Sequence, residues 1–309
     1  MNKFKKTQLV KPTMLQIVFG VAVFFLKKHT PPKVIPHISQ YTHISSIKKD
    51  AFKNFSLGIY TDGEEKVFIK TWTGRVKDFK YYSLVNEYFV SPILRKKFAE
   101  SGYKDRIFVP EVKDVVVGEY SLSVVFEYID GAHLDNFPIE RQEEVLREIC
   151  EAFAKISLSL TDEEKSHFTK RTLPFYILSL PFLLGMVGAK NPRKFPLAFR
   201  YALKNILGAR SLVGQPLAIA HRDLTPKNIC IRKGKAYVFD CEGVVMTLPS
   251  YDLLQIKTVP EFSGFAALSP LRTLHSGFLF MFITLHTLVN VKNVPSWQEY
   301  LVPIITKSV

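Results

Sequence analysis

The sequence predicts a two-lobed α+β fold, in which a small antiparallel-sheet lobe is followed by a larger, mainly helical lobe. The chain has 309 residues, of which 47% are hydrophobic, so it can bury a sizeable core. Hairpin patterns are concentrated in residues 43–128, which we assign to the N-lobe. Helical patterns dominate residues 129–309, which we assign to the C-lobe. Residues 1–42 are basic and apolar and form an N-terminal appendage.

Two hairpins and one helix make up the predicted N-lobe. Segments 55–72 and 112–129 are rich in β-branched and aromatic residues, with turns at Asp62-Gly63 and Gly118-Glu119. Between them, residues 78–94 carry apolar residues at helical spacing. The lobe is therefore expected to combine an antiparallel sheet with one helix.

The predicted C-lobe begins with an amphipathic helix at residues 141–160, whose apolar side chains fall on one face. A basic and apolar region follows at 165–212, where we expect helical pieces interrupted by prolines. The interrupting residues are Pro181, Pro192 and Pro196. Residues 217–240 then predict a strand, a loop and a second hairpin, and helical periodicity returns after Asp252.

The segment HRDLTPKN, residues 221–228, carries the strongest chemical signal. Asp223 and Asn228 lie five residues apart on it, and Asp240 follows twelve residues after Asn228. Phosphoryl transfer needs a carboxylate that orients the attacking hydroxyl and accepts its proton, and oxygen ligands for Mg²⁺ on the nucleotide phosphates. Asp223 fits the role of base, and Asn228 and Asp240 fit the role of metal ligands. His221 would order the loop by hydrogen bonding.

Four further features follow the same template in chain order. Lys70 lies in a strand, on the opposite face from its apolar neighbours, and Glu87 lies seventeen residues later in a helix, where it can pair with Lys70. The sequence FEYIDG, residues 126–131, marks a hinge, and Asp252 opens a helix. Each feature alone is also typical of a solvated strand, helix or turn. Their combination in this order favours phosphotransfer.

These residues resemble the protein-kinase-like superfamily, and within it the aminoglycoside and choline phosphotransferase branch, over residues 43–260. The resemblance implies ATP as the nucleotide and Mg²⁺ as the cofactor. It implies that Lys70 contacts the α- and β-phosphates while Glu87 fixes Lys70. It also implies that Asp223 is the catalytic base.

The resemblance extends to the metal, the adenine and the loop. Asn228 and Asp240 match the Mg²⁺ ligands of the family, with Asn228 and Lys70 also counted in the catalytic set. The Glu127 carbonyl and the Ile129 amide would bind adenine. Phe126 would be the gatekeeping side chain, and Asp252, with His221, would support the catalytic loop.

Departures from the protein-kinase pattern favour a small acceptor. Thr225 stands where eukaryotic protein kinases have Lys, and only eleven residues separate Asp240 from Asp252, too few for a loop that docks a protein substrate. FDCEG resembles the D-x-E form of small-molecule phosphotransferases, with Glu242 as a further metal candidate. Arg222 favours the protein-kinase alternative, because the phosphotransferases usually have Gly there.

The charge pattern bears on the acceptor. The net charge is +14, and the tract from Lys165 to Arg222 carries ten Lys or Arg and no Asp or Glu. A polycationic acceptor such as an aminoglycoside would need an acidic site, so an anionic, sugar-containing or lipid-linked acceptor fits better. A solvated basic face is the alternative. The candidate contacts are Lys190, Arg193, Lys194, Arg200 and Lys204.

Three apolar runs raise the question of a membrane. Residues 14–26 and 277–289 are shorter than the roughly 20 residues that span a bilayer, and residues 173–189 contain two prolines. Buried core helices are one interpretation, and a shallow contact with an anionic membrane surface is the other. The three scattered cysteines indicate a reducing compartment. We therefore expect a cytoplasmic protein, with peripheral attachment at the inner membrane face left open.

Other functions remain as alternatives. The stretch 46–58, where a glycine-rich phosphate loop would lie, has only Gly58, which leaves open a catalytically degenerate scaffold. A protein kinase of atypical type is a second alternative. Nucleic-acid binding is disfavoured, because the basic residues alternate with apolar runs and no recognised nucleic-acid motif occurs.

Overall fold

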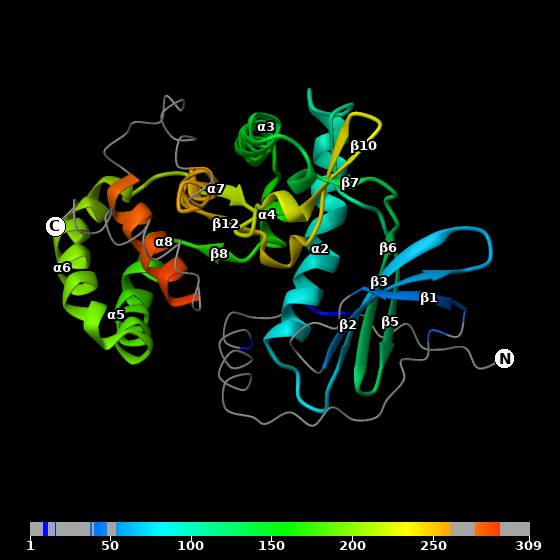
Figure 1. Cartoon of the computed structure of the whole chain (residues 1–309), viewed down its shortest axis with the longest axis horizontal. Coiled ribbons are helices and arrows are strands. Elements are labelled where there is room, and N and C mark those ends of the chain that lie inside the picture. The colour runs from blue at the N-terminus through cyan, green and yellow to red at the C-terminus, as the bar shows by residue number, and fades with distance from the viewer. Residues whose placement is uncertain are drawn as a thin grey trace. The chain divides into compact units, whose positions relative to one another are not determined.

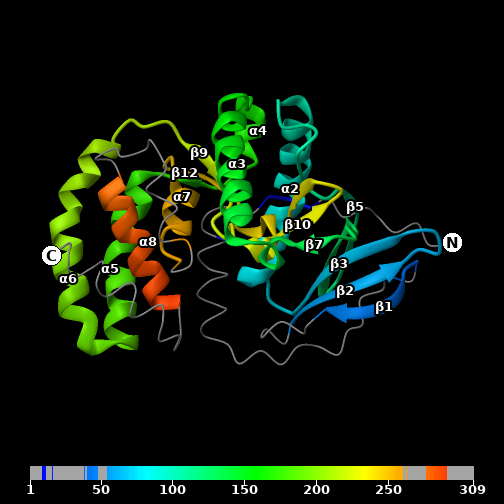
Figure 2. The same cartoon turned by 45° about the horizontal axis from the view of Figure 1, so that its top comes forward.

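The computed structural model describes residues 9–11, 16, 38, 40–47, 54–259, 262 and 276–290. The chain divides into two compact units that are discontinuous in sequence (Figures 1 and 2). Unit 1 comprises residues 1–133, 161–168 and 228–244, and unit 2 comprises residues 134–160, 169–227 and 245–309. The segment 228–244, placed in the C-lobe by the sequence, thus packs within unit 1. The lobe boundary at 128/129 stays a prediction.

Unit 1 contains the predicted antiparallel sheet, in the order β1-β2-β3-β6-β5. Its strands are β1 (Thr42–Ile47), β2 (Phe55–Thr61), β3 (Lys66–Thr73), β5 (Val112–Gly118) and β6 (Ser121–Glu127). Both predicted hairpins are present. The second turn is one residue later than predicted, because Gly118 pairs with Ser121 and leaves Glu119-Tyr120 as the two turn residues.

The helix α2 (Phe79–Glu100) follows β3 and starts one residue later than predicted. Asp78 caps it, accepting hydrogen bonds from the amides of Lys80 and Tyr81. The same buried carboxylate accepts from Trp72 Nε1 at 2.9 Å and from Asn54 Nδ2 at 2.7 Å. One acid therefore ties the start of α2 to the sheet. The helix continues past residue 94 to Glu100, with Pro92 inside it.

A second sheet in unit 1 joins four short strands in the order β4-β11-β10-β7. They are β4 (Ile107–Phe108), β7 (Ala132–His133), β10 (Ile229–Arg232) and β11 (Lys235–Val238). Gly131 lets the hinge approach β10 closely, because a Cβ there would lie 2.6 Å from Cys230 Sγ and from the Ile231 carbonyl oxygen. The five-residue helix α4 (Asp162–Ser166) completes this unit.

Unit 2 is mainly helical. Its helices are α3 (Ile139–Leu158), α5 (Leu173–Lys190), α6 (Phe195–Ile206), α7 (Tyr251–Ile256) and α8 (Ser276–Asn290). Helices α5, α6 and α8 lie side by side in both views, around a core that includes Tyr176, Tyr201 and Phe282 (Figures 1 and 2). A small sheet in the order β8-β12-β9 is formed by Lys170–Arg171, Val245–Thr247 and Ala218–Ala220. The predicted α+β class is confirmed.

One element of unit 2 differs from the prediction. Pro181 was expected to interrupt the helical region, but α5 runs through it from Leu173 to Lys190. Pro192 begins a 3-10 turn, and Pro196 lies in the first turn of α6, where the missing amide hydrogen costs nothing. Among the described residues, α5 is the one helix long and apolar enough to cross a membrane. The run 277–289 belongs to α8, and 14–26, apart from Gln16, lies outside the described residues.

Candidate functional site

The strand β3 positions Lys70 in the interior of unit 1. Side chains alternate along a strand, so Lys70 lies on the opposite face from Val67 and Ile69, which pack together in a separate core cluster. Lys70 is 5% exposed, and its Nζ lies 5.8 Å from the centre of the Phe126 ring. A buried ammonium without a partner would be strongly destabilising, so its contacts decide whether the arrangement is stable.

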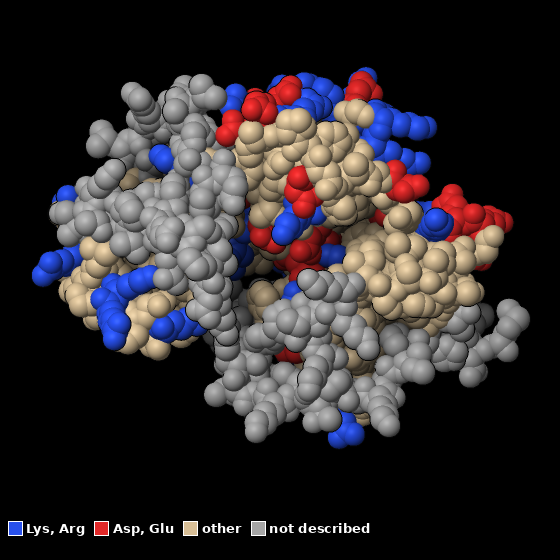
Figure 3. Space-filling view, viewed as in Figure 1, with Lys and Arg blue, Asp and Glu red and all other residues tan. Residues whose placement is uncertain are grey.

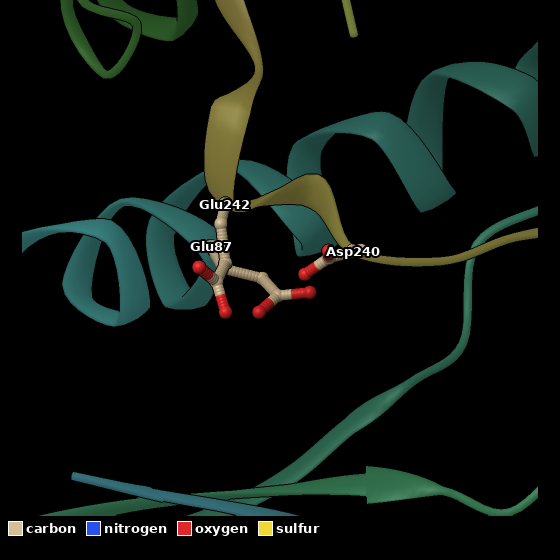
Figure 4. Close-up of side chains that lie close together, drawn as sticks. All are labelled: Glu87, Asp240 and Glu242. Atoms are coloured by element: carbon tan, nitrogen blue, oxygen red, sulfur yellow. The ribbon is translucent and has the colours of Figure 1, made fainter. Parts of the chain in front are cut away.

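Three carboxylates surround the Lys70 ammonium. Its Nζ lies 2.8 Å from Glu87 Oε2, 2.6 Å from Asp240 Oδ1 and 3.4 Å from Glu242 Oε1. These acids come from α2 and from the segment after β11, and their carboxylates point toward one another (Figure 4). The structure thus brings together the predicted pair and the predicted metal ligand Asp240.

Helix α2 holds the segment after β11 through two consecutive residues. Glu87 Oε1 accepts a hydrogen bond from the Cys241 amide at 3.0 Å, while its other oxygen faces Lys70. Asn86 Nδ2 donates to the Glu242 carbonyl at 3.1 Å and the Val244 carbonyl at 3.0 Å. Asp240 has a left-handed backbone with φ of 60°, uncommon for a residue other than glycine. The neighbouring hydrogen bonds help to hold this strained turn in place.

The acids outnumber the cations in this cluster. The pKa of Glu87 is raised to about 8, mainly by burial and in part by the nearby Asp240 and Glu242, against the opposing effect of Lys70. Burial also raises the pKa of Glu242. For Lys70, burial opposes the charged form, but Asp240, Glu87 and Glu242 together hold its pKa well above the usual range. When all three acids are ionised, the site carries more negative than positive charge, and a further cation would relieve this excess.

The donor set suits a magnesium ion. One oxygen from each of Glu87, Asp240 and Glu242 lies within 4.8 Å of the others, and carboxylate oxygens are ligands that Mg²⁺ prefers. Asp240 is the most accessible of the three, with 39% of its side chain exposed. Glu87 is already engaged by Lys70 and by the Cys241 amide. Asp240 and Glu242 are therefore the better ligands.

Two residues of this cluster were missed by the sequence analysis. Lys80 Nζ lies 3.4 Å from Glu242 Oε2, and Asn86 makes the two backbone contacts described above. Asn86 directly precedes Glu87 on α2. Its position next to a predicted site residue was the signal available in the sequence. Nothing in the sequence around Lys80 indicated its partner.

The predicted hinge lies at the end of β6. Phe126 and Ile129 are buried, and Glu127 is half-buried. Glu127 Oε2 accepts hydrogen bonds from Arg95 Nη1 at 3.0 Å and from the Glu111 amide at 3.2 Å. These contacts fix the backbone at the position where adenine binding is expected.

The catalytic loop of unit 2 is anchored by Asp252 on α7. The buried Asp252 carboxylate accepts from the His221 amide at 2.7 Å and from the Arg222 amide at 2.8 Å. His221 is fully buried, and Arg222 has a left-handed backbone with φ of 69°. Asp223, which the sequence predicts to be the base, follows directly and is exposed. Asn228, five residues later, ends the 3-10 turn Pro226–Asn228 and is itself assigned to unit 1.

Comparisons with known proteins agree with this geometry. Over residues 95–266, more than half of the chain, the sequence matches the family described as the phosphotransferase enzyme family. The structure resembles aminoglycoside phosphotransferase APH(4)-Ia in ternary complex with AMP-PNP and hygromycin B. The TM-score is 0.64 at 14% identity, over 88% of this chain and 95% of that chain. A comparison with the sequences of curated proteins gave no match.

Two further solved structures show the same fold. Spectinomycin phosphotransferase APH(9)-Ia, in complex with ADP and spectinomycin, has a TM-score of 0.56 at 12% identity, over 91% of this chain and 99% of that chain. The streptomycin–ATP–APH(2")-IIa ternary complex has a TM-score of 0.54 at 12% identity, over 87% and 93%. Fold and site therefore define a kinase-like phosphotransferase. The chain belongs to the phosphotransferase enzyme family and is a phosphotransferase with an alcohol group as acceptor.

The Asp252 anchor leads to a stability prediction. Asp252→Ala leaves two backbone amides without their acceptor in a buried place, so we expect a loss of about 3 kcal/mol in the free energy of unfolding. Asp252→Asn keeps one acceptor oxygen and should lose less. Urea unfolding measures both, with the exposed Glu151→Ala as the control in the same unit. Equal stability of Asp252→Ala and the control would contradict the anchoring role.

A pH dependence follows from His286 on α8. Burial, with Arg222, Arg171 and Lys190 nearby, lowers the pKa of His286 to about 4 from its ordinary value of 6.5. Between these two values the unfolded chain binds a proton at His286 that the folded protein does not. The protein should therefore lose stability as the pH falls from 6.5 toward 4, and His286→Gln should lose less over that window.

Urea unfolding at a series of pH values measures this difference. His133→Gln, at an exposed histidine of β7, is the control and should follow the unsubstituted protein. An identical pH profile for His286→Gln and the unsubstituted protein would contradict the prediction.

Proposed function

We propose that the protein transfers the γ-phosphate of Mg·ATP to a hydroxyl of a small, anionic or lipid-linked acceptor. The observation that carries the proposal is the cluster of Lys70 with Glu87, Asp240 and Glu242. It combines one buried cation able to contact phosphate oxygens with a surplus of carboxylates suited to a divalent ion. A catalytically degenerate scaffold would have no need to keep this costly buried charge set.

In this proposal each site residue has a separate chemical role. Asp240, with Asn228 and Glu242, would hold Mg²⁺, which neutralises charge on the phosphates. Lys70 would turn from Asp240 toward the phosphate oxygens while Glu87 keeps it oriented. Asp223 would accept the proton of the acceptor hydroxyl as its oxygen bonds to the γ-phosphorus, and the bond to the bridging oxygen breaks to release ADP.

The basic tract supports an anionic acceptor rather than a polycation. Residues 165–222 contain no Asp or Glu, so unit 2 offers no acid in this tract to bind positive groups. Hygromycin B, spectinomycin and streptomycin, in the complexes above, are ligands of those proteins. Of the basic candidates, Arg193, Arg200 and Lys204 are exposed, and Lys190 Nζ donates to the Val289 carbonyl at 2.8 Å.

Exposed apolar rows on α5 and α6 support contact with an anionic membrane surface. Leu178 and Phe182 are 78% and 67% exposed, and on α6 Phe199 and Leu203 are 43% and 55% exposed at the same i, i+4 spacing. Only 33% of α5 is buried, although its length and composition resemble a core helix. On the face shown, the region of α5 and α6 carries basic but no acidic side chains (Figure 3). Apolar rows among basic residues suit a bilayer with anionic head groups.

The nucleotide proposal is tested by titrating ATP with and without Mg²⁺. Asp240→Asn removes a metal ligand, so we expect Mg·ATP affinity to fall about tenfold or more. Asp223→Asn removes only the base, so it should keep ATP affinity while turnover falls about 10²- to 10⁴-fold. Calorimetry measures binding, and ADP release with or without acceptor measures turnover.

The control for both variants is Asp105→Asn, an exposed turn residue of unit 1. ATP binding that ignores both Mg²⁺ and Asp240→Asn would refute the nucleotide site. Full turnover by Asp223→Asn would refute the role of Asp223.

The membrane proposal is tested by sedimentation with phosphatidylcholine vesicles that contain or lack an anionic lipid. The protein should sediment with the anionic vesicles, and the double change Phe199→Ser with Leu203→Ser should reduce binding about tenfold or more, because two apolar side chains lose their burial in the interface. Leu158→Ser, at an 82% exposed residue of α3, is the matched control. Equal binding of both variants would remove the α6 row from the membrane contact.

A further inference from the structure

Two arginines of unit 2 form no ion pair with an acid of the described residues. Arg171 ends β8, and Arg222 lies on the catalytic loop. Both side chains are half-buried, and the Nε atom of each is buried without a hydrogen-bond partner. No carboxylate of the described chain lies within ion-pair distance of either guanidinium. Buried polar atoms are normally hydrogen-bonded, so the two unpartnered Nε atoms require an explanation.

The surroundings of the two arginines are aromatic rather than acidic. The Arg171 guanidinium lies 4.9 Å from the centre of the Phe175 ring, and that of Arg222 lies 5.9 Å from the centre of the Tyr251 ring. Such cation–π contacts orient a guanidinium but leave its charge in place. Burial, together with the charge of Arg222, lowers the pKa of Arg171 to about 9. The two cations therefore interact unfavourably with each other.

Asp252 is the acid that would be expected to neutralise Arg222. Both of its carboxylate oxygens accept hydrogen bonds from backbone amides, those of His221 and Arg222, and it forms no ion pair with the Arg222 side chain. Asp252 thus holds the loop but does not pair with the guanidinium group of Arg222. The fork geometry of arginine suits a phosphate or carboxylate group, which it can bind through two parallel hydrogen bonds.

The backbone presents both side chains from fixed positions. Arg171 pairs with Thr247 in the sheet of β8 and β12, and Thr247 Oγ1 also contacts the Tyr176 hydroxyl. Arg222 is held in its left-handed conformation by the Asp252 contact, so its side chain leaves the loop immediately before Asp223. A ligand group bound by Arg222 would therefore lie on the same short loop as the proposed base.

We propose that Arg171 and Arg222 form a binding site for an anionic group of the acceptor, a phosphate or a carboxylate, next to the hydroxyl that receives the phosphoryl group. The identification of the bound molecule as the acceptor rests on the proposed function. The site would restrict the acceptor to hydroxyl compounds that already carry a negative group. Neutral polyols lack the group that the arginines bind. Polycations would meet two positive charges beside the base.

The first test uses inorganic phosphate as the probe and needs no acceptor. Millimolar phosphate should raise the Tm of the unsubstituted protein, and Arg171→Gln should abolish the rise. Arg210→Gln, at an exposed basic residue of the same unit, is the matched control and should keep it. Lys70→Met identifies any phosphate bound at the nucleotide site, because it affects that contribution alone. A phosphate-dependent rise that Arg171→Gln leaves intact would overturn the proposal.

A second variant separates loss of binding from loss of folding. Arg222→Gly removes the guanidinium at a backbone φ of 69°, which glycine adopts without strain, so the variant should fold. It should also lose the response to phosphate. A folded Arg222→Gly with the full response would count against the site as clearly as an unaffected Arg171→Gln.

The second test compares acceptors in pairs, each a polyol with and without a phosphate group. The phosphorylated member should be the better substrate, and Arg171→Gln should raise its KM about tenfold or more while ATP affinity is unchanged. Equal turnover of the phosphorylated and unphosphorylated polyol would refute the anionic subsite but not the proposed function. Absence of ATP binding would instead refute the proposed function, and the phosphate response would still report on the two arginines.

Discussion

The contact between the Lys70 ammonium and three carboxylates is the interaction on which the rest of unit 1 depends. It joins β3, α2 and the segment after β11, which are 17 and 170 residues apart in the chain. Removing one partner of a buried ion pair typically costs about 3–5 kcal/mol, because the other charge stays buried. The cluster is therefore expensive to keep, and a surplus of acid makes it more so. In the proposed function, a divalent cation and a phosphate bound there offset this cost.

The two units hold their functional loops by the same physical means. In unit 1, Glu87 accepts the Cys241 amide and leaves its second oxygen for Lys70. In unit 2, Asp252 accepts two consecutive amides of the catalytic loop. In each case a buried carboxylate fixes the backbone next to a strained residue, Asp240 or Arg222. The residues proposed for chemistry then extend from rigid backbone, and Asp223 and Asp240 keep accessible side chains.

Local patterns predicted most of the fold and part of the site. The hairpins, α2 and α3 follow from alternation and helical spacing, and Lys70, Glu87 and Asp240 follow from their order along the chain. Contacts that depend on tertiary packing could not be predicted. Nothing adjacent in sequence links Lys80 to Glu242, or Arg171 to Arg222. Pro181 was misjudged because a proline disfavours a helix locally, whereas packing of α5 against α6 and α8 maintains it.

The absence of acids from residues 165–222 bears directly on the acceptor. Arginines folded within that tract must find their counter-ions elsewhere in unit 2. The carboxylate of Asp252, which could act as a counter-ion, accepts hydrogen bonds from backbone amides instead. Phe175 and Tyr251 contact the guanidinium groups through uncharged aromatic rings. A protein that simply needed stability would be better served by apolar residues at Arg171 and Arg222. Among the described residues no acid pairs with the two guanidinium groups, and in our proposal a bound molecule supplies that charge. Because Arg222 precedes Asp223, the proposal assigns that role to the molecule whose hydroxyl Asp223 would deprotonate.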